Sequence, residues 1–180
     1  ELIGSATATG TATGGSPRFF KPYAVVYDKL MQDKMYVVDT WNHRVVKLTP
    51  STGNTGDFVG STDGDSGYSD GTSGVARLKY PKDICVDSGG TAFIADGMNN
   101  AIRQATSSAV VTTIAGQVET PKEGWIDDTR GTDARFNGPW GITIFLDKDL
   151  IVSEYGNNAI RKVRVSSYAV STLVGIGQPT

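Results

Sequence analysis

The amino-acid sequence predicts an all-β fold made of three similar four-stranded antiparallel sheets. Several sequence markers recur at nearly constant intervals along the 180 residues, and short apolar runs alternate with turns rich in Gly, Asp, Asn and Ser. Glycine supplies 22 of the 180 residues, more than the usual 7% or so, which favours turns over long helices. No 11-residue window shows the apolar period of an amphipathic helix.

Three independent markers keep one period, which shows that the chain is built from repeats. A proline that follows an arginine by four residues recurs at intervals of 59 and 58 residues. An acidic residue after an apolar run recurs at 57 and 58, and a glycine that closes another run recurs at 56 and 59. A further copy of the glycine, Gly4, precedes Gly60 by 56 residues. The markers are Pro22, Pro81 and Pro139; Asp39, Asp96 and Glu154; and Gly60, Gly116 and Gly175.

Each period contains four predicted strands. The first follows the proline, whose missing N–H is tolerated at the start of a strand, over 23–27, 83–86 and 140–145. The second precedes the acidic residue, over 35–38, 91–94 and 150–153. The third follows a turn that contains Asn, over 44–48, 101–105 and 159–164. The fourth ends at the glycine, over 57–59, 110–115 and 169–174.

Four short antiparallel strands per repeat are the unit of a β-propeller, in which each sheet, or blade, packs against its neighbours on both faces. Burial on both faces explains why the strands read as near-continuous apolar runs. Parallel β-solenoids have repeats of about 20–30 residues, roughly half of this period. The period therefore favours the propeller.

The segments around the acidic marker resemble the NHL repeat, whose pattern reads roughly V-A-D-T-G-N-H-R-I-R-K. The connections that end in Gly74-Val-Ala-Arg77 and Thr132-Asp-Ala-Arg-Phe136 are also similar to the inter-blade segment of that family. The second and third copies carry Asn100 and Asn158 in place of the histidine, and the third replaces Asp by Glu154. The three segments are Val37-Val-Asp-Thr-Trp-Asn-His-Arg-Val-Val-Lys47, Ile94-Ala-Asp-Gly-Met-Asn-Asn-Ala-Ile-Arg103 and Val152-Ser-Glu-Tyr-Gly-Asn-Asn-Ala-Ile-Arg161.

The resemblance covers essentially the whole chain and implies an NHL-type β-propeller, which usually has six blades. We therefore expect one region, residues 1–180, with an end strand of a preceding blade and its connection at 1–21 and blades at 22–60, 81–116 and 139–175. Three blades are half of a six-bladed ring, and exposing an apolar blade face costs about 25 cal/mol per Å². We expect either a homodimer that completes the ring or a fragment of a longer chain. The strand Glu1–Gly4 is a spare that could complete a blade of the partner.

Composition and charge exclude several classes of protein. Seventeen Lys and Arg against 19 Asp and Glu give a net charge of −2, so the basic excess typical of nucleic-acid binding is missing. One cysteine, Cys85, allows no internal disulfide, and one histidine, His43, allows no zinc site with two histidines from one chain. No apolar run approaches the roughly 18 residues of a membrane span. No signal-peptide pattern and no Asn-x-Ser/Thr sequon is visible, which favours an intracellular location.

The connections between blades are the candidate binding surface. They place 17, 20 and 22 residues between the closing glycine and the next proline, and loops above about 12–15 residues are usually functional or disordered. All three leave the same end of the sheets and two are rich in acids, so we expect an acidic surface that binds a protein or peptide. The alternative is a solvated layer over the sheets, and no metal or cofactor is expected. The candidate residues are Asp63, Asp65, Tyr68, Asp70, Glu123, Trp125, Asp127 and Asp128.

Residues that recur in every blade are expected to be structural, because repeat proteins place such contacts periodically. The arginine before each proline is expected to bind the carbonyls of the connection. The arginines of the third strands are expected to pack their stems over the blades and pair with the acidic marker. The structural candidates are Arg18, Arg77 and Arg135; Asp39, Asp96 and Glu154; and Asn42, Asn99 and Asn157.

The sequence therefore predicts a non-enzymatic scaffold that binds a protein or peptide partner on the face formed by the long connections. The alternative is an RNA-binding module that uses the basic third strands. A second alternative is a ligand-sensing or lyase-type propeller with a central-channel site, although the lyase among related propellers needs histidines that this chain lacks. His43 is the only general-base candidate of its type, and Cys85 is expected to be a buried hydrophobe. The cations of the RNA alternative are Arg44, Lys47, Arg103, Arg161, Lys162 and Arg164.

Overall fold

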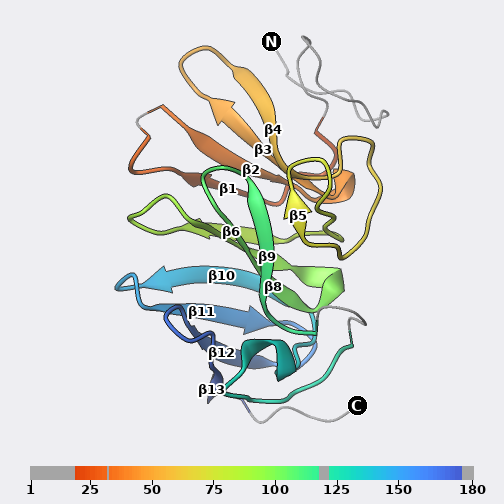
Figure 1. Ribbon diagram of the computed structural model, residues 1–180, viewed down its shortest axis with the longest axis vertical. Coiled ribbons are helices and arrows are strands. Elements are labelled where there is room, and N and C mark those ends of the chain that lie inside the picture. The colour runs from red at the N-terminus through yellow and green to blue at the C-terminus, as the bar shows by residue number, and fades with distance from the viewer. Residues whose placement is uncertain (1–18, 32, 118–121, 176–180) are drawn as a thin grey trace.

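The computed structural model describes residues 19–31, 33–117 and 122–175. Arg18 and the predicted strand Glu1–Gly4 lie outside these residues. The described chain is all-β and forms three antiparallel sheets that follow one another along the long axis of the molecule (Figure 1). None of the described helices is long and apolar enough to cross a membrane.

Each sheet is a blade of four strands that pair in chain order. Blade 1 contains β1 (Ala24–Tyr27), β2 (Met35–Asp39), β3 (Arg44–Thr49) and β4 (Asn54–Gly60). Blade 2 contains β6 (Asp83–Val86), β7 (Ala92–Asp96), β8 (Ala101–Ala105) and β9 (Val110–Ala115), with a fifth strand, β5 (Gly71–Thr72), on the outer edge of β9. Blade 3 contains β10 (Pro139–Phe145), β11 (Asp149–Glu154), β12 (Ala159–Arg164) and β13 (Val170–Val174).

The four-stranded blades confirm the predicted fold class, and the strand bounds agree within a few residues. The largest shift is in β4, which begins at Asn54 and not at Asp57. The strand β5 was not predicted, because it lies in a glycine-rich connection without an apolar pattern. Its Gly71 pairs with Val111 of β9, so the connection before blade 2 returns along the outer strand of that blade.

Short turns join the second strand to the third in every blade. In blades 1 and 2 they are the 3₁₀ turns η1 (Thr40–Asn42) and η2 (Gly97–Asn99), and η3 (Gly131–Asp133) lies in the connection before blade 3. The residue that ends each second-to-third turn has a left-handed backbone, with φ of 56° at His43, 51° at Asn100 and 49° at Asn158. Asn tolerates this conformation better than most residues, which explains why Asn replaces the histidine in two repeats.

The hydrophobic core consists of two layers, one between each pair of neighbouring blades. The inner strands β1, β6 and β10 lie next to one another. Blades 1 and 2 enclose side chains that include Tyr36, Val38 and Ile94, and blades 2 and 3 enclose Phe93, Ile102 and Leu150 among others. The residues of blade 2 therefore alternate between the two layers, as a sheet that is covered on both faces requires.

Candidate functional site

A buried ion pair lies at the centre of blade 2. Arg103 on β8 is almost completely buried, and its Nη1 lies 2.8 Å from Oδ2 of Asp96, the last residue of β7. Asp96 also accepts hydrogen bonds from the side chain of Asn99, at 2.8 Å, and from the backbone N–H of Lys79, at 2.7 Å. Burial raises the pKa of the Asp96 carboxyl, and the Arg103 guanidinium and these hydrogen bonds oppose that rise.

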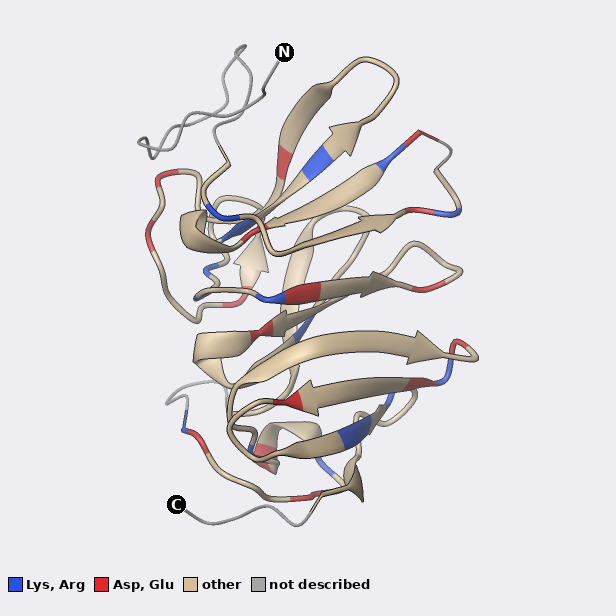
Figure 2. Cartoon of the chain, turned by 180° about the vertical axis from the view of Figure 1, so that it is seen from behind, with Lys and Arg blue, Asp and Glu red and all other residues tan. Residues whose placement is uncertain are grey.

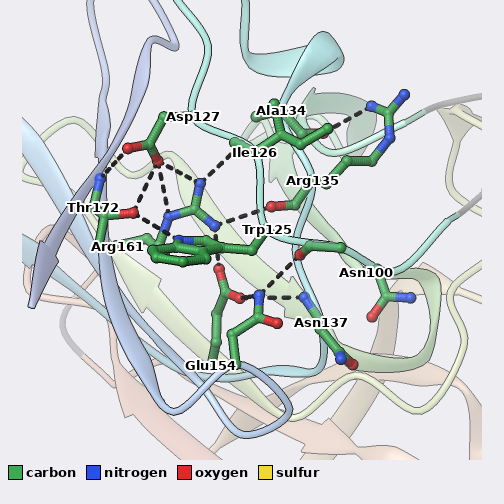
Figure 3. A network of polar contacts seen from close by, with 12 residues as sticks. Asn100, Trp125, Ile126, Asp127, Ala134, Arg135, Asn137, Glu154, Arg161 and Thr172 are labelled. Carbon is green, nitrogen blue, oxygen red and sulfur yellow. Dashed lines mark hydrogen bonds and ion pairs between the residues drawn. The ribbon is translucent and has the colours of Figure 1, made fainter. Parts of the chain in front are cut away.

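Blade 3 repeats the arrangement with a glutamate (Figure 3). Arg161 Nη1 lies 2.6 Å from Oε1 of Glu154, and both side chains are fully buried. The Glu154 carboxylate also accepts hydrogen bonds from the side chain of Asn157 and from the backbone N–H of Asn137. The longer side chain of Glu154 therefore keeps the partners that an aspartate has in the other blades.

Blade 1 contains the same kind of ion pair, but its arginine stands at a different position in the third strand. Arg44 is the first residue of β3, two positions before the place that Arg103 and Arg161 occupy in their strands, and its Nε lies 2.9 Å from Oδ2 of Asp39. Asn42 donates to the same Asp39 oxygen at 2.7 Å. The predicted pairing of the third-strand arginines with the acidic markers is confirmed in all three blades.

The structure gives Asp70 and Asp127 a structural role that the sequence did not predict. Both were placed on the acidic binding surface, but Asp70 Oδ1 lies 2.7 Å from Nη2 of Arg103 and Asp127 Oδ1 lies 2.6 Å from Nη2 of Arg161. Each carboxylate also accepts a hydrogen bond from the backbone N–H of Thr113 or Thr172 on the outer strand. A buried guanidinium needs these acceptors, so the two residues attach the connections to the blades.

The other predicted binding residues remain at the surface of the two connections, which Figure 2 shows with acidic segments in red. No hydrogen bond or ion pair within the described residues joins the two connections, so the structure does not bring these residues into one site. Trp125 Nε1 donates to Thr172 Oγ1 at 2.9 Å, and the Asp128 carboxylate accepts from the Arg130 N–H at 2.8 Å. Among the residues that the structure describes, four of these side chains make no hydrogen bond: Asp63, Asp65, Tyr68 and Glu123.

The arginines before the prolines were predicted to bind backbone carbonyls, and the two that the structure describes do so. Nη1 of Arg77 donates to the carbonyl of Gly74 at 2.7 Å, and Nη1 of Arg135 donates to that of Asp133 at 2.9 Å. Arg18 lies outside the described residues. Each side chain therefore binds carbonyls within the last turn of its own connection.

The two candidate nucleophile or base residues have structural surroundings. The side chain of His43 is buried, and its Nδ1 accepts a hydrogen bond of 3.1 Å from the backbone N–H of Tyr80. Burial lowers the pKa of His43 below its ordinary value of 6.5. Burial also raises the pKa of the Cys85 thiol to about 12, so Cys85 is the buried hydrophobe that the sequence predicts.

An exposed aromatic surface lies where the second-to-third turns and the repeat prolines meet. The residues that directly follow the prolines, Tyr23, Lys82 and Trp140, come together from three blades. Lys82 Nζ lies 4.3 Å from the ring centroid of Tyr23 and 5.1 Å from that of Trp140. Trp140 in turn stacks on Tyr155, with centroids 4.3 Å apart and planes 12° apart. A cation and three rings therefore form one continuous stack across the blades.

A second group of rings lies between blades 1 and 2. Trp41 contacts Phe20 and Tyr80 edge to face, with centroids 5.3 Å and 5.2 Å away. Lys21 Nζ lies 4.1 Å from the centroid of Trp41. We call the two groups together the turn-end surface. Its members are Phe20, Lys21, Tyr23, Trp41, Tyr80, Lys82, Trp140 and Tyr155.

Two residues of the turn-end surface have strained backbones. Lys21 and Tyr80, each directly before a proline, have φ of 48° and 46°, and the equivalent residue in blade 3 is Gly138 with φ of 60°. Glycine adopts this conformation without strain, but a bulky side chain does not. The backbones of Lys21 and Tyr80 are therefore strained in the conformation that exposes these side chains. Such strain is often found at functional positions.

The lysines of the turn-end surface have no acidic partner. Within the described residues, no carboxylate oxygen lies within ion-pair distance of Lys21 or Lys82. Burial against the rings lowers the pKa of Lys82. The surface is thus aromatic and cationic. Sequence reasoning missed it, although aligning the repeats by their prolines would have placed Tyr23, Lys82 and Trp140 at one position.

Comparison with known proteins supports the fold. No family model matches the chain. The Arabidopsis thaliana protein SUPPRESSOR OF QUENCHING 1, chloroplastic, is 33% identical over 70 residues, which are 39% of this chain and 6% of that protein.

Among solved structures, a structural genomics protein of unknown function from Bacteroides thetaiotaomicron matches with a TM-score of 0.71 and 28% identity, over 89% of this chain and 38% of that one. Virginiamycin B lyase from Staphylococcus aureus matches with a TM-score of 0.58 and 20% identity, over 88% and 42%. The chain thus has β-propeller blades and spans well under half the length of these proteins.

Proposed function

We propose that these blades form a non-enzymatic binding module that takes a segment of a partner protein on the turn-end surface. One observation carries the proposal: the stack Tyr155–Trp140–Lys82–Tyr23 is built from side chains of all three blades and is open to solvent. Tyr155, at one end of the stack, has 68% of its surface exposed. Large exposed rings are costly in water and mark contact surfaces.

The chemistry of the turn-end surface favours a protein segment. Trp and Tyr dominate the binding energy of protein interfaces because they bury a large rigid area and retain a polar group. The unpaired lysines beside the rings favour a segment that carries carboxylates next to aromatic, proline or aliphatic side chains. The NHL-type assignment belongs to the same proposal.

The connections supply a second part of the proposed site. They lie beside the turns, because Asn99 Nδ2 donates to the carbonyl of Gly67 at 2.6 Å and Asn157 Nδ2 donates to that of Gly124 at 2.8 Å. A long partner segment that leaves the rings can therefore reach the exposed residues of the connections. Tyr68 and Trp125 are the rings available there.

The non-enzymatic part of the proposal rests on where the reactive side chains are. His43 uses Nδ1 as an acceptor for Tyr80 N–H, and Cys85 is buried between blades. The acids with raised pKa, Asp96 and Glu154, are enclosed in ion pairs that no solvent reaches. The likeness to the lyase is one of fold alone and gives this chain no activity.

Single-stranded nucleic acid is a second candidate ligand, on the same surface. The third-strand arginines Arg44, Arg103 and Arg161 are buried and paired, so they cannot form the basic belt considered from the sequence. The combination of Lys21 and Lys82 with exposed rings is instead the pairing of cations and stacking surfaces that single strands use.

Selection from a phage-displayed random peptide library tests the first candidate. Selected peptides, labelled with fluorescein, are titrated by polarisation against the chain and its Trp140→Ala, Tyr155→Ala and Trp125→Ala variants. The matched control is Phe145→Ala, which removes an exposed ring at the other end of β10. We expect about tenfold or weaker binding for the first two variants, as for a buried aromatic anchor, and little change for the control. Loss of peptide binding in Trp125→Ala alone would place the binding site on the connections.

A labelled oligouridine serves as the probe for the second candidate. Binding that weakens steeply with salt and is lost in Lys82→Ala would favour nucleic acid. Failure to select any peptide, together with tight oligouridine binding, would overturn the protein-segment proposal.

A further inference from the structure

The two blade interfaces inside the chain are built from equivalent residues. Blade 1 turns Tyr36, Val38 and Val45 toward blade 2, and blade 2 turns the residues at the same repeat positions, Phe93, Ala95 and Ile102, toward blade 3. All six are almost completely buried. The same repeat positions define the outer faces of blades 1 and 3.

Within the described residues, no blade packs against the corresponding face of blade 3. Its residues at the same positions are Ile151, Ser153 and Ile160, and each is partly exposed. With Thr143 of the inner strand they line a hollow of about 270 Å³. A hollow occupies the place that the next blade fills in the other two interfaces.

The opposite face of blade 1 is the counterpart. Val25 on β1 is 62% exposed, whereas the equivalent inner-strand residues Ile84 and Ile142 are 3% and 5% exposed because the preceding blade covers them. One end of the three-blade array thus offers an inner-strand valine, and the other end offers a hollow of the kind that accepts such a residue.

A hydrogen bond accompanies each internal interface. His43 Nδ1 accepts from Tyr80 N–H, and Asn100 Oδ1 accepts from Gly138 N–H at 2.8 Å. The next acceptor in this series is Asn158 and the missing donor is the N–H of Lys21. Both already have the left-handed backbone of their equivalents, with φ of 49° and 48°. Within the described residues, no partner engages either group.

We propose that the open face of blade 3 binds the open face of blade 1 of a second copy of this chain, with Val25 in the hollow and Asn158 accepting the Lys21 N–H. The contact is head to tail, so it must close into a ring or continue as a fibre. Closed propellers have four to eight blades, and two copies of the three described blades make six. The pair contains two identical contacts, and each uses the backbone N–H of Lys21, whose side chain belongs to the turn-end surface.

The solution mass, from size-exclusion chromatography with light scattering over a dilution series, tests the proposal. We expect about 38 kDa, twice the 19.1 kDa of one chain. Val25→Arg and Ile160→Glu each place a charge in both contacts, so each variant should run at the mass of one chain. Leu30→Arg, on the exposed β1–β2 hairpin tip, is the matched control and should stay paired. Circular dichroism checks that each variant is folded.

Mixing the two variants tests the direction of the contact. A Val25→Arg copy keeps a native blade 3 face and an Ile160→Glu copy keeps a native blade 1 face. Their mixture has one native contact and one contact that pairs Arg with Glu, so it should regain a species of twice the chain mass although neither variant pairs alone. A wild-type chain that stays at 19.1 kDa at every concentration overturns the proposal. So does a pair that both variants leave intact, or a mixture that does not pair.

Discussion

The imidazole of His43 joins the first blade to the second, because its Nδ1 lies 3.1 Å from the backbone nitrogen of Tyr80 and accepts the hydrogen. Asn100 makes the equivalent contact with Gly138 at 2.8 Å. The repeat position thus requires a left-handed backbone and a side-chain acceptor, and both His and Asn meet this requirement. The chemistry of an imidazole is not what the position uses.

Replacing His43 tests this explanation. His43→Asn should keep the acceptor, as Asn100 does, and should change the free energy of unfolding little. His43→Leu leaves the Tyr80 N–H without a partner between the blades, which should cost about 1–3 kcal/mol. Urea denaturation at neutral pH measures both. Equal losses in the two variants would contradict the acceptor role.

The same contact predicts a pH dependence. Burial and the nearby Lys79 lower the pKa of His43 in the folded chain below its ordinary value of 6.5, against a smaller opposite effect of Asp65. The unfolded chain therefore binds the proton more readily, so this contribution to stability is complete above pH 6.5 and is lost as the pH falls below it. Thermal unfolding from about pH 8 to about pH 5.5 should show a steeper decline for the wild type than for His43→Asn. Equal declines in the stability of the two proteins would contradict a role of His43 in this pH dependence.

The buried ion pairs should be essential in each blade. Arg103→Met removes the guanidinium that pairs with Asp96 and leaves this carboxylate as an uncompensated buried charge, which should cost about 3–5 kcal/mol. Arg130→Met is the matched control: its pair with Asp133 is exposed, and exposed pairs contribute about 0–1 kcal/mol. Guanidinium denaturation compares the two. A small loss for Arg103→Met would mean that the blade does not depend on this pair.

Gly131 is expected to tolerate no side chain. A Cβ there would collide with the carbonyl oxygen of Ile114 and lie 2.6 Å from that of Tyr168, whereas a Cβ at Gly56 meets nothing within 4 Å. Gly131→Ala should therefore destabilise the chain by about 1–3 kcal/mol or more, and Gly56→Ala should not. Melting temperatures measured side by side decide this, and an unchanged value for Gly131→Ala would show that the connection can move away.

Much of the fold could be predicted because the repeat markers are themselves structural. Pro22, Asp39 and Gly60 mark strand boundaries, so their spacing defines the blades. The pairing of Asp96 with Arg103 followed from charge and periodicity. The position of Arg44 could not be inferred in this way, because it reaches Asp39 from a different place in its strand.

The candidate site was much harder to predict. Asp70 and Asp127 looked like free acids because nothing in the sequence shows that a connection returns along its blade to a buried arginine. Asp57 stands at the repeat position of Thr113 and Thr172, and its carboxylate lies 3.1 Å from Nη1 of Arg44. In blade 1 the outer strand thus supplies the acid that the connections supply in blades 2 and 3. Trp41 and Tyr155 come from turns, and Lys82 reaches Tyr23 and Trp140 only when the blades pack side by side.

The measurement that tests the central claim most directly is hydrogen–deuterium exchange of the chain with and without a peptide selected from the random library. If the turn-end surface is the binding surface, exchange should slow at residues 20–23, 40–43, 79–82, 138–141 and 155–158. Protection confined to 61–72 and 122–130 would contradict the claim and place the partner on the acidic connections.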